Sequence, residues 1–461
     1  MRQFNFKGKF RITPNICLGS EFSFFINLPF LGTSKQDRVC IYPYYVIKFI
    51  CKIISKLQEK IFDGLFTWKG EGNLELVIIE RCPDYNYEEL IKALKNVFEK
   101  LGGIDKYIKP GMKVALKPNL IRKKNPESGA TTHPLFIKAV AALVKEAGGI
   151  VTIVESPGGL FTKSILKGVY SGCGVEKAAL EAGVNLNYDI SETIVDNPEG
   201  KYLKKVTIVK ALADADFIIN LPKLKTHGQM VYTGAVKNMF GAVPGELKAE
   251  YHLRMSEYSE FADALIDIFL SVKPGLNIMD AIVGMEGEGP TAGNPREIGV
   301  IIAGENAFKV DFAALKLINV NPLDVPVISQ AVKRGLCPDN FHDIEICCDN
   351  FELYKVEDFN VPQLNALRAV TFYDKGVFKL IMNWLKPKPV FLHGKCIGCG
   401  VCRKVCPPSV IVMKNNKPEA DLKGCIRCFC CQELCPEKAV VIKRPAILDL
   451  YMKKRKKGRM A

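Results

Sequence analysis

Eight of the 17 cysteines form two runs with the same spacing near the end of the 461-residue chain. The first run is Cys396-x2-Cys399-x2-Cys402-x3-Cys406-Pro407, and the second is Cys425-x2-Cys428-x2-Cys431-x3-Cys435-Pro436. Two-residue gaps let three successive thiolates wrap one face of an iron–sulfur cubane, while the fourth ligand must come from a distant segment. The spacing therefore predicts 4Fe–4S clusters.

The two runs resemble those of bacterial-type two-cluster ferredoxins, over about fifty residues. In that family the fourth cysteine of each run serves the other cluster. The resemblance implies two clusters, one held by Cys396, Cys399, Cys402 and Cys435, the other by Cys425, Cys428, Cys431 and Cys406. It also implies paired strands at Ile411–Met413 and Val440–Ile442. Zinc is the alternative, but four-cysteine zinc sites normally come as two Cys-x2-Cys pairs. Cys430 is left over, and we expect a packed thiol there.

The part of the chain before these runs alternates strands and helices. Strands are expected at 77–81, 113–117, 150–155, 206–210, 217–221, 276–282 and 298–303, and helices at 87–101, 135–147, 257–270 and 308–318. Alternation of this kind predicts an α/β domain with a mostly parallel sheet, followed by a small α+β ferredoxin domain.

Polar residues concentrate in the loops expected after these strands. Ligands in open parallel sheets bind at the carboxyl ends of strands. Each residue has an ordinary reading, since a loop histidine is often only hydrogen-bonded and a lysine can simply pair with a carboxylate or phosphate. Their convergence nevertheless predicts a site, with catalytic candidates His133, His227, Lys237 and His252 and cofactor-binding candidates Lys117, Asn119, Lys225 and Glu286.

Residues 76–445 resemble a bacterial and archaeal family of uncharacterised iron–sulfur cluster-binding proteins. In that family a large domain of unknown function precedes the ferredoxin module, and no reaction is settled. The resemblance rests on five motifs: Val114–Asn119, Thr132–Pro134, Leu221–His227, Ala235–Gly241 and Gly284–Pro290.

A fainter resemblance connects the large domain to nickel-pincer lactate racemases. It rests on His227, Thr233–Lys237, Pro244-Gly245 and His252. It implies that Lys237 anchors a cofactor, that His252 is a metal ligand, and that His227 and His133 act as acid and base. The sequence departs from that family at the turn before Lys237, which has one glycine instead of two. A further metal or organic cofactor in the α/β domain is thus left open.

Two functions are consistent with these features. The first is an electron-transfer protein, a ferredoxin-linked oxidoreductase that uses a soluble carrier of the ferredoxin or flavodoxin type and an unknown small-molecule substrate. The second is a non-redox racemase or isomerase of a hydroxy acid or related carboxylate, with a structural or regulatory ferredoxin module. A cluster carrier is a third class, but it explains the large α/β domain poorly. The chain has neither a dinucleotide-binding fingerprint nor a P-loop.

We predict four parts: an N-terminal extension at 1–73, an α/β domain at 74–385, the ferredoxin domain at 391–445 and a basic tail at 446–461. The extension shows no sustained periodicity, and we hypothesise that it is a translated leader. The alternative is an amphipathic membrane-surface segment around residues 44–62. The net charge of +15 comes from these two ends and the cysteine module, so specific nucleic-acid binding by the central domain is not indicated. No transmembrane segment or secretory signal is recognised, which predicts a cytoplasmic location.

Overall fold

The computed structural model describes residues 76–361 and 386–444. The predicted leader at 1–73 and the basic tail at 446–461 lie outside the described residues. Within the described residues, no helix is long and apolar enough to cross a membrane.

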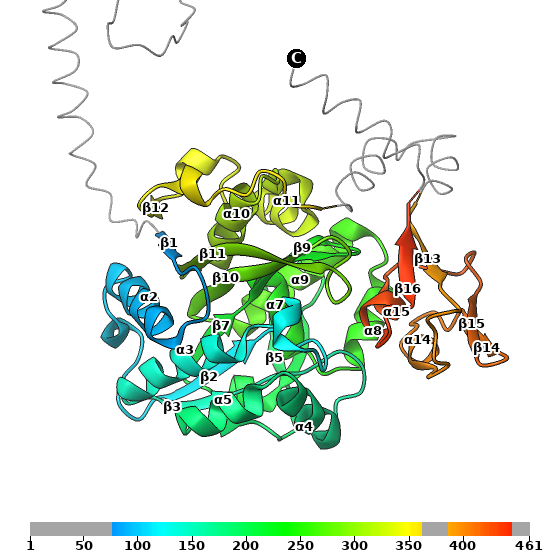
Figure 1. The fold of residues 1–461 in the computed structure, drawn as a ribbon, viewed down its shortest axis with the longest axis horizontal. Helices are drawn as coiled ribbons and strands as arrows, with labels where there is room; N and C mark the ends of the chain where they lie inside the picture. Colours follow the sequence, from blue (N-terminus) through cyan, green and yellow to red (C-terminus); the bar gives the residue numbers. More distant parts are fainter. Residues whose placement is uncertain (1–75, 362–385, 445–461) are drawn as a thin grey trace, which may run out of the picture. The chain divides into compact units, whose positions relative to one another are not determined.

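A ten-stranded sheet organises residues 76–361 (Figure 1). Its main path runs β12-β1-β11-β10-β7-β2-β3-β4, and β8 pairs with β10 and β9. Pairing is parallel at most steps, and antiparallel where β11 meets β1 and β10 and where β8 meets β9. The predicted α/β domain with a mostly parallel sheet is confirmed. The strands are β1 (Val77–Arg81), β2 (Lys113–Pro118), β3 (Ile150–Ile153), β4 (Asn185–Leu186), β7 (Phe217–Leu221), β8 (Lys223–His227), β9 (Val231–Thr233), β10 (Leu276–Glu286), β11 (Asn294–Gly304) and β12 (Ile346–Cys347).

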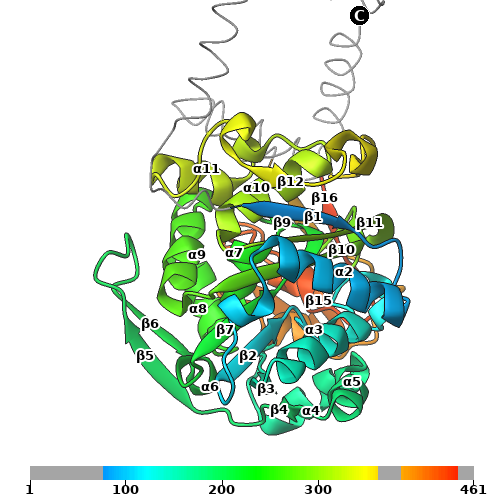
Figure 2. The same cartoon turned by 90° about the vertical axis from the view of Figure 1, so that its left-hand side faces the viewer.

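Helices cover both faces of this sheet (Figures 1 and 2). Successive strand side chains point to opposite faces, so Ile78 packs in one apolar cluster while Val77 and Ile79 pack in the other. The first cluster joins the sheet to α2 (Tyr87–Lys100), α3 (Pro134–Glu146), α4 (Lys163–Gly172) and α5 (Val175–Ala182). The second joins it to α7 (Ala235–Asn238), α8 (Leu247–Arg254), α9 (Tyr258–Val272), α10 (Ala307–Leu317) and α11 (Pro326–Lys333).

Local sequence explains where the long helices begin. The Asn86 side chain accepts hydrogen bonds from the backbone N–H groups of Glu88 and Glu89, and these two glutamates lie in the positive first turn of α2. The Asn306 side chain caps α10 in the same way. The four helices predicted from apolar periodicity appear within one or two residues of their expected bounds.

Two segments differ from the sequence-based expectation. The 206–210 strand forms as β6 (Lys205–Val209), but it pairs with β5 (Glu192–Asp196) in a hairpin apart from the main sheet, followed by the short helix α6 (Lys210–Ala213) (Figure 2). The segment Leu221–His227 was expected to be a polar loop. It contains strand β8 instead, whose five residues are all buried.

The cysteine-rich segment is a small module of short strands and helices. Its elements are β13 (Lys388–Phe391), α14 (Val401–Lys404), β14 (Ile411–Lys414), β15 (Lys417–Ala420), α15 (Cys430–Glu433) and β16 (Val440–Lys443). The expected strands near 411 and 440 are present but do not pair with each other: β14 pairs with β15, and β16 pairs with β13. The module's first strand thus begins at Lys388, before the predicted start at 391. The predicted small ferredoxin-like domain is confirmed.

Candidate functional site

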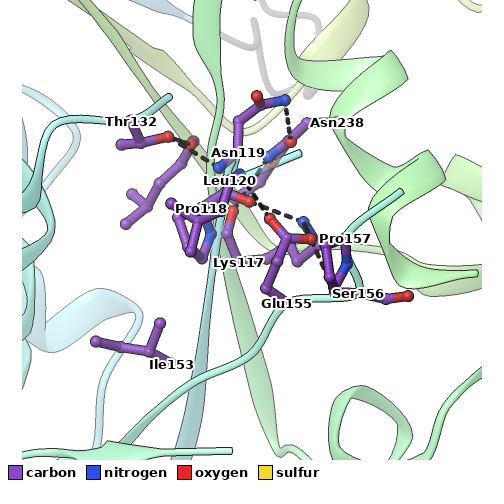
Figure 3. Close-up of polar contacts among 12 residues, drawn as sticks. Lys117, Pro118, Asn119, Leu120, Thr132, Ile153, Glu155, Ser156, Pro157 and Asn238 are labelled. Atoms are coloured by element: carbon purple, nitrogen blue, oxygen red, sulfur yellow. Dashed lines mark hydrogen bonds and ion pairs between the residues drawn. The ribbon is translucent and has the colours of Figure 1, made fainter. Parts of the chain in front are cut away.

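The carboxyl end of β2 carries a buried ion pair (Figure 3). Lys117 Nζ lies 2.8 Å from Glu155 Oε1, and both side chains are almost completely buried. Glu155 also accepts hydrogen bonds from the backbone N–H groups of Leu120 (2.7 Å) and Ser156 (2.8 Å). Burial lowers the pKa of Lys117, and Glu155 opposes that shift. The carboxylate therefore holds the loop after β2 against the loop after β3.

Asn119, two residues after Lys117, contacts one helix residue and one strand residue of the site. Its side chain donates to Asn238 Oδ1 at 2.9 Å and accepts from Lys225 Nζ at 2.6 Å. Lys225 also donates to the carbonyl oxygen of Ala130. Burial lowers the pKa of Lys225 to about 7. Asn119 and Lys225 are thus brought together, as expected for one site.

Lys237 and Asn238 lie in the short helix α7, which follows β9. Asn238 donates to the Lys117 carbonyl and to Asn220 Oδ1, so α7 is fixed against the ends of β2 and β7. Gly241, which comes next, must be small: a Cβ there would lie 2.5 Å from Lys117 Nζ and 2.8 Å from Glu155 Oε1. This explains why the Ala235–Gly241 motif ends in glycine.

Lys248 and His252 lie one turn apart on α8. Lys248 Nζ donates to the Ser156 carbonyl at 2.7 Å and to the Pro157 carbonyl at 3.2 Å. Burial lowers the pKa of Lys248 to about 7. Burial, followed by the charge of Lys237, lowers the pKa of His252 to about 3. The His252 imidazole is therefore neutral near pH 7 and can donate or accept a hydrogen bond there, but cannot act as a cationic acid.

These segments surround a cavity of about 470 Å³. From the α/β domain, its wall includes four of the predicted site residues, Lys117, Asn119, Lys237 and His252. From the cysteine-rich module, the wall includes Lys404, Val405, Cys430, Glu433 and Leu434. The cavity is thus lined by both domains.

The other predicted candidates lie outside this wall. His227 is buried at the end of β8, where its Nδ1 accepts from the N–H groups of Gln229 and Met230 and its Nε2 lies 3.8 Å from Glu433 Oε2. Burial lowers its pKa well below the usual value. Glu286 accepts from the N–H of Asn360.

His133 belongs to a separate buried cluster. Its ring caps the start of α3 and stacks on Tyr85 at 3.7 Å between centroids. Tyr85 in turn bonds Lys223 and Asp280, which form their own ion pair at 2.7 Å. All of these polar groups have partners inside the cluster, so the structure does not bring His133 together with Lys237 and His252.

The eight motif cysteines fall into two groups. Cys396, Cys399, Cys402 and Cys435 line one small enclosed space with apolar side chains that include Phe391 and Val440. Burial raises the pKa of Cys406, and the charges of Cys428 and Cys425 add to the rise. Burial also raises the pKa of Cys431, and the charges of Cys428, Cys425, Cys406 and Cys402 raise it further. The assignment of these cysteines to two ligand sets stays a prediction.

The donor chemistry of each group fits a cubane. Each set offers four thiols in largely apolar surroundings, as an iron–sulfur cluster needs. In the described part of the chain, no group of three or more His, Cys, Asp or Glu side chains could hold a single metal ion. Cubane ligands bond to different irons, so they stand farther apart than the ligands of one ion.

Hydrogen bonds tie the module to the loop between β10 and β11. Arg444 makes a two-pronged contact with Glu288, at 2.6 and 3.1 Å. Gln432 donates to the Glu288 carbonyl at 3.0 Å, and the Thr291 hydroxyl donates to the Glu433 carbonyl at 2.8 Å. Glu288 therefore serves as an attachment point for the module.

Glu155, Lys248 and Glu433 are among the wall residues that sequence reasoning missed. Glu155 stands in a loop that the strand pattern already marked, and a carboxylate directly after a strand was the available signal. Lys248 has no local signal, because its partners lie about ninety residues away. Glu433 lies between Cys431 and Cys435, and the cysteine spacing there gives no signal for the glutamate.

Two family models match this chain. Residues 114–316 match a domain of unknown function, DUF362, and residues 388–436 match a 4Fe-4S dicluster domain. Two solved structures are similar to part of this chain: a lactate racemase apoprotein from Thermoanaerobacterium thermosaccharolyticum (14% identity, TM-score 0.31) and a Thermotoga maritima protein (15% identity, TM-score 0.32). Each match covers 52% of this chain, which spans 57% and 60% of those two chains.

A curated relative is more similar. The thylakoid-associated protein of Synechocystis sp. is 33% identical over 318 residues, which cover 65% of this chain and 95% of that protein. The predicted pairing of an uncharacterised large domain with a cysteine-rich ferredoxin module is confirmed by the two family models. The chain belongs to the family of DUF362 proteins that carry a 4Fe–4S dicluster domain.

Proposed function

We propose that this chain is a ferredoxin-linked oxidoreductase that exchanges electrons with a small molecule bound in the 470 Å³ cavity. One observation carries the proposal. Cys430, Glu433 and Leu434 in the cavity wall come from the same segment as Cys431 and Cys435. Lys404 and Val405 come from the segment between Cys402 and Cys406. A molecule in the cavity therefore touches the chain between cluster ligands from both runs.

The proposed ligand sets are those expected from the sequence: Cys396, Cys399, Cys402 and Cys435 for one 4Fe–4S cluster, and Cys425, Cys428, Cys431 and Cys406 for the other. When bound, the clusters supply one-electron transfer. Cys430 is not in either set; this residue is buried and lines the cavity.

Electron exchange with an external carrier is proposed at the exposed side of the first set. Cys399 is exposed, and the neighbouring Ile397 side chain is 65% exposed. Lys395, Arg403 and Lys414 are exposed on the same module. The module thus exposes both an apolar side chain and several basic ones. Such a surface suits an acidic soluble carrier of the ferredoxin or flavodoxin type, because opposite charges steer the encounter.

Within the cavity we propose that Lys237 and His252 face the bound molecule. Lys117, Asn119 and Lys225 position the wall through the Glu155 and Asn238 contacts. The alternative, a racemase or isomerase of a hydroxy acid, needs acid and base groups facing the substrate. His227 and His133 do not line the cavity, which favours the redox function.

The test is anaerobic preparation of the full chain, with iron and sulfide analysis and EPR of the reduced protein. We expect about eight irons per chain and two reducible clusters. Cys396→Ser should remove about half of the reducible signal, while Cys347→Ser, at a cysteine outside both sets, should leave it intact. Clusters that do not reduce would contradict electron transfer. Unchanged signals in Cys396→Ser would contradict the ligand assignment.

A further inference from the structure

The cavity wall is rich in positive charge. Four lysines line it, Lys117, Lys237, Lys248 and Lys404, against three glutamates, Glu155, Glu246 and Glu433. Lys225 lies just behind the wall, bonded to Asn119. An excess of cations in a partly closed space attracts an anion, because the surrounding protein screens charge less than water does.

The lysines differ in what satisfies them. Lys117 pairs with Glu155, and Lys248 donates to two carbonyls and to the Ser156 hydroxyl. Lys237 is different. Among the described residues, its ammonium has no hydrogen-bond or ion-pair partner and contacts only the ring face of Phe240, at 5.6 Å. Burial lowers the pKa of this half-buried lysine, and the charge of Glu433 opposes that shift without forming an ion pair with it.

The carboxylates of the wall do not fill this gap. Glu155 is engaged by Lys117 and two backbone N–H groups. The Glu433 carboxylate lies 3.8 Å from His227 Nε2, and its charge acts on Lys237 from beyond ion-pair distance. Glu246, the third wall glutamate, forms no ion pair with Lys237 among the described residues. Lys237 therefore has room for one further negative charge, which a ligand can bring.

The other side chains of the wall indicate what the uncharged part of that ligand is like. Ile121, Leu160, Phe240, Val405 and Leu434 give apolar surface around the lysine. The neutral His252 ring, whose Nδ1 has no partner in the described part of the chain, adds one hydrogen-bonding group. Small-molecule sites commonly combine such apolar walls with a few fixed polar groups.

We infer that the cavity binds a small organic monocarboxylate, whose carboxylate pairs with Lys237 and whose apolar body lies against Phe240 and Leu434. This inference rests on the proposed function, since it names the substrate class for the same cavity. One unpaired ammonium matches one negative charge. A phosphate dianion would require more donors, whereas Lys117 and Lys248 are already engaged and Lys404 is exposed to solvent.

The test is calorimetric titration of the oxidised, cluster-loaded full chain with benzoate, phenylacetate and hexanoate. Benzamide and inorganic phosphate are the matched comparisons, the first without charge and the second without an apolar body. We expect at least one carboxylate to bind about tenfold or more tightly than benzamide and phosphate. Lys237→Met should weaken that binding by about tenfold or more, because it removes a charge-assisted hydrogen bond.

Two variants serve as controls. Lys237→Arg keeps the charge and should stay within about threefold of the wild-type affinity, while Lys177→Met removes an exposed lysine of α5 and should change nothing. Iron content and EPR are recorded on every sample. Absence of carboxylate binding, equal binding of phosphate, or an unaltered affinity in Lys237→Met overturns the inference. Reducible clusters in those same samples would leave the electron-transfer function standing, so the two failures can be told apart.

Discussion

At the scale of single residues, buried lysines dominate this molecule. Lys117, Lys223 and Lys225 are each at most 1% exposed, although lysine is almost never fully buried unless paired. Two of them face a carboxylate, Glu155 or Asp280, while Lys225 has only neutral oxygens as partners. Burial lowers the pKa of all three lysines, and it lowers that of Lys225 to about 7.

Lys248 gives the clearest pH prediction. Its folded pKa is about 7, whereas that of an unfolded lysine is about 10.4. Between these values the unfolded chain binds more protons, so stability rises with pH. The charges around it, Glu155, Lys117, Glu433 and Lys237, are the same in the variant. In a plot of unfolding free energy against pH, the slope between pH 7 and 8.5 should therefore be lower in Lys248→Met than in wild type, by about 1 kcal/mol per pH unit.

The measurement is the urea unfolding midpoint of the cluster-loaded protein at several pH values. Lys177→Met, at an exposed position, should keep the wild-type slope. An equal slope in Lys248→Met and wild type would show that Lys248 stays protonated in the folded state throughout this range.

The residues that sequence reasoning identified share one feature. Lys117 and Asn119 lie at or just after the end of β2, and Lys237 lies in the short helix after β9, so position along the chain marks them. Glu155 and Lys248 depend on partners distant in sequence, and burial in this cavity gives them their role. A single sequence read by itself carries no signal of such long-range pairings.

At the scale of elements, β8 shows why polarity misled the sequence-based reading. Its residues Lys223–His227 contain three basic side chains, which suggested a loop. The strand pairs with β10 and β9. Lys223 donates a hydrogen bond to Asp280, and Lys225 donates one to Asn119. Apolar strands and helices were predictable from periodicity, but a buried strand of lysines needs partners that only the fold supplies.

The short helix α7 depends on Asp311 of α10. The buried Asp311 carboxylate accepts from the N–H groups of Ala235 (2.6 Å) and Val236 (3.0 Å), and from the Tyr232 hydroxyl (3.3 Å). Burial raises the pKa of Asp311 to about 7. A four-residue helix has little stability of its own, so this carboxylate positions α7 and with it Lys237.

Asp311→Asn tests this dependence. Asparagine offers one acceptor oxygen in place of two, so at least one N–H of α7 loses its partner. We expect a loss of about 1–3 kcal/mol in unfolding free energy. The variant should also bind more weakly the carboxylate ligand that the wild-type protein binds in the calorimetric titration. Asp343→Asn, on an exposed 3-10 turn, is the matched control. Unfolding and binding curves identical to wild type would mean that α7 is held by its other contacts.

At the scale of the whole molecule, the cavity depends on the module's attachment. Five of the wall residues belong to the module, so any loosening of it opens the cavity. Arg444 and Glu288 supply the only ion pair between module and loop in the described part of the chain, with side chains 10% and 37% exposed. Partly shielded two-pronged pairs of this kind are stronger than exposed ones.

Charge reversal tests whether this pair holds the module. Glu288→Arg and Arg444→Glu each place like charges in contact, so each should weaken carboxylate binding several-fold and speed hydrogen exchange in α15, with cluster EPR unchanged. The double variant restores opposite charges, and we expect it to recover most of both effects, because interacting sites are non-additive. A double variant no better than either single one would assign the attachment to the Gln432 and Thr291 hydrogen bonds instead. The cavity would then be set by backbone contacts of α15, independent of ionic strength.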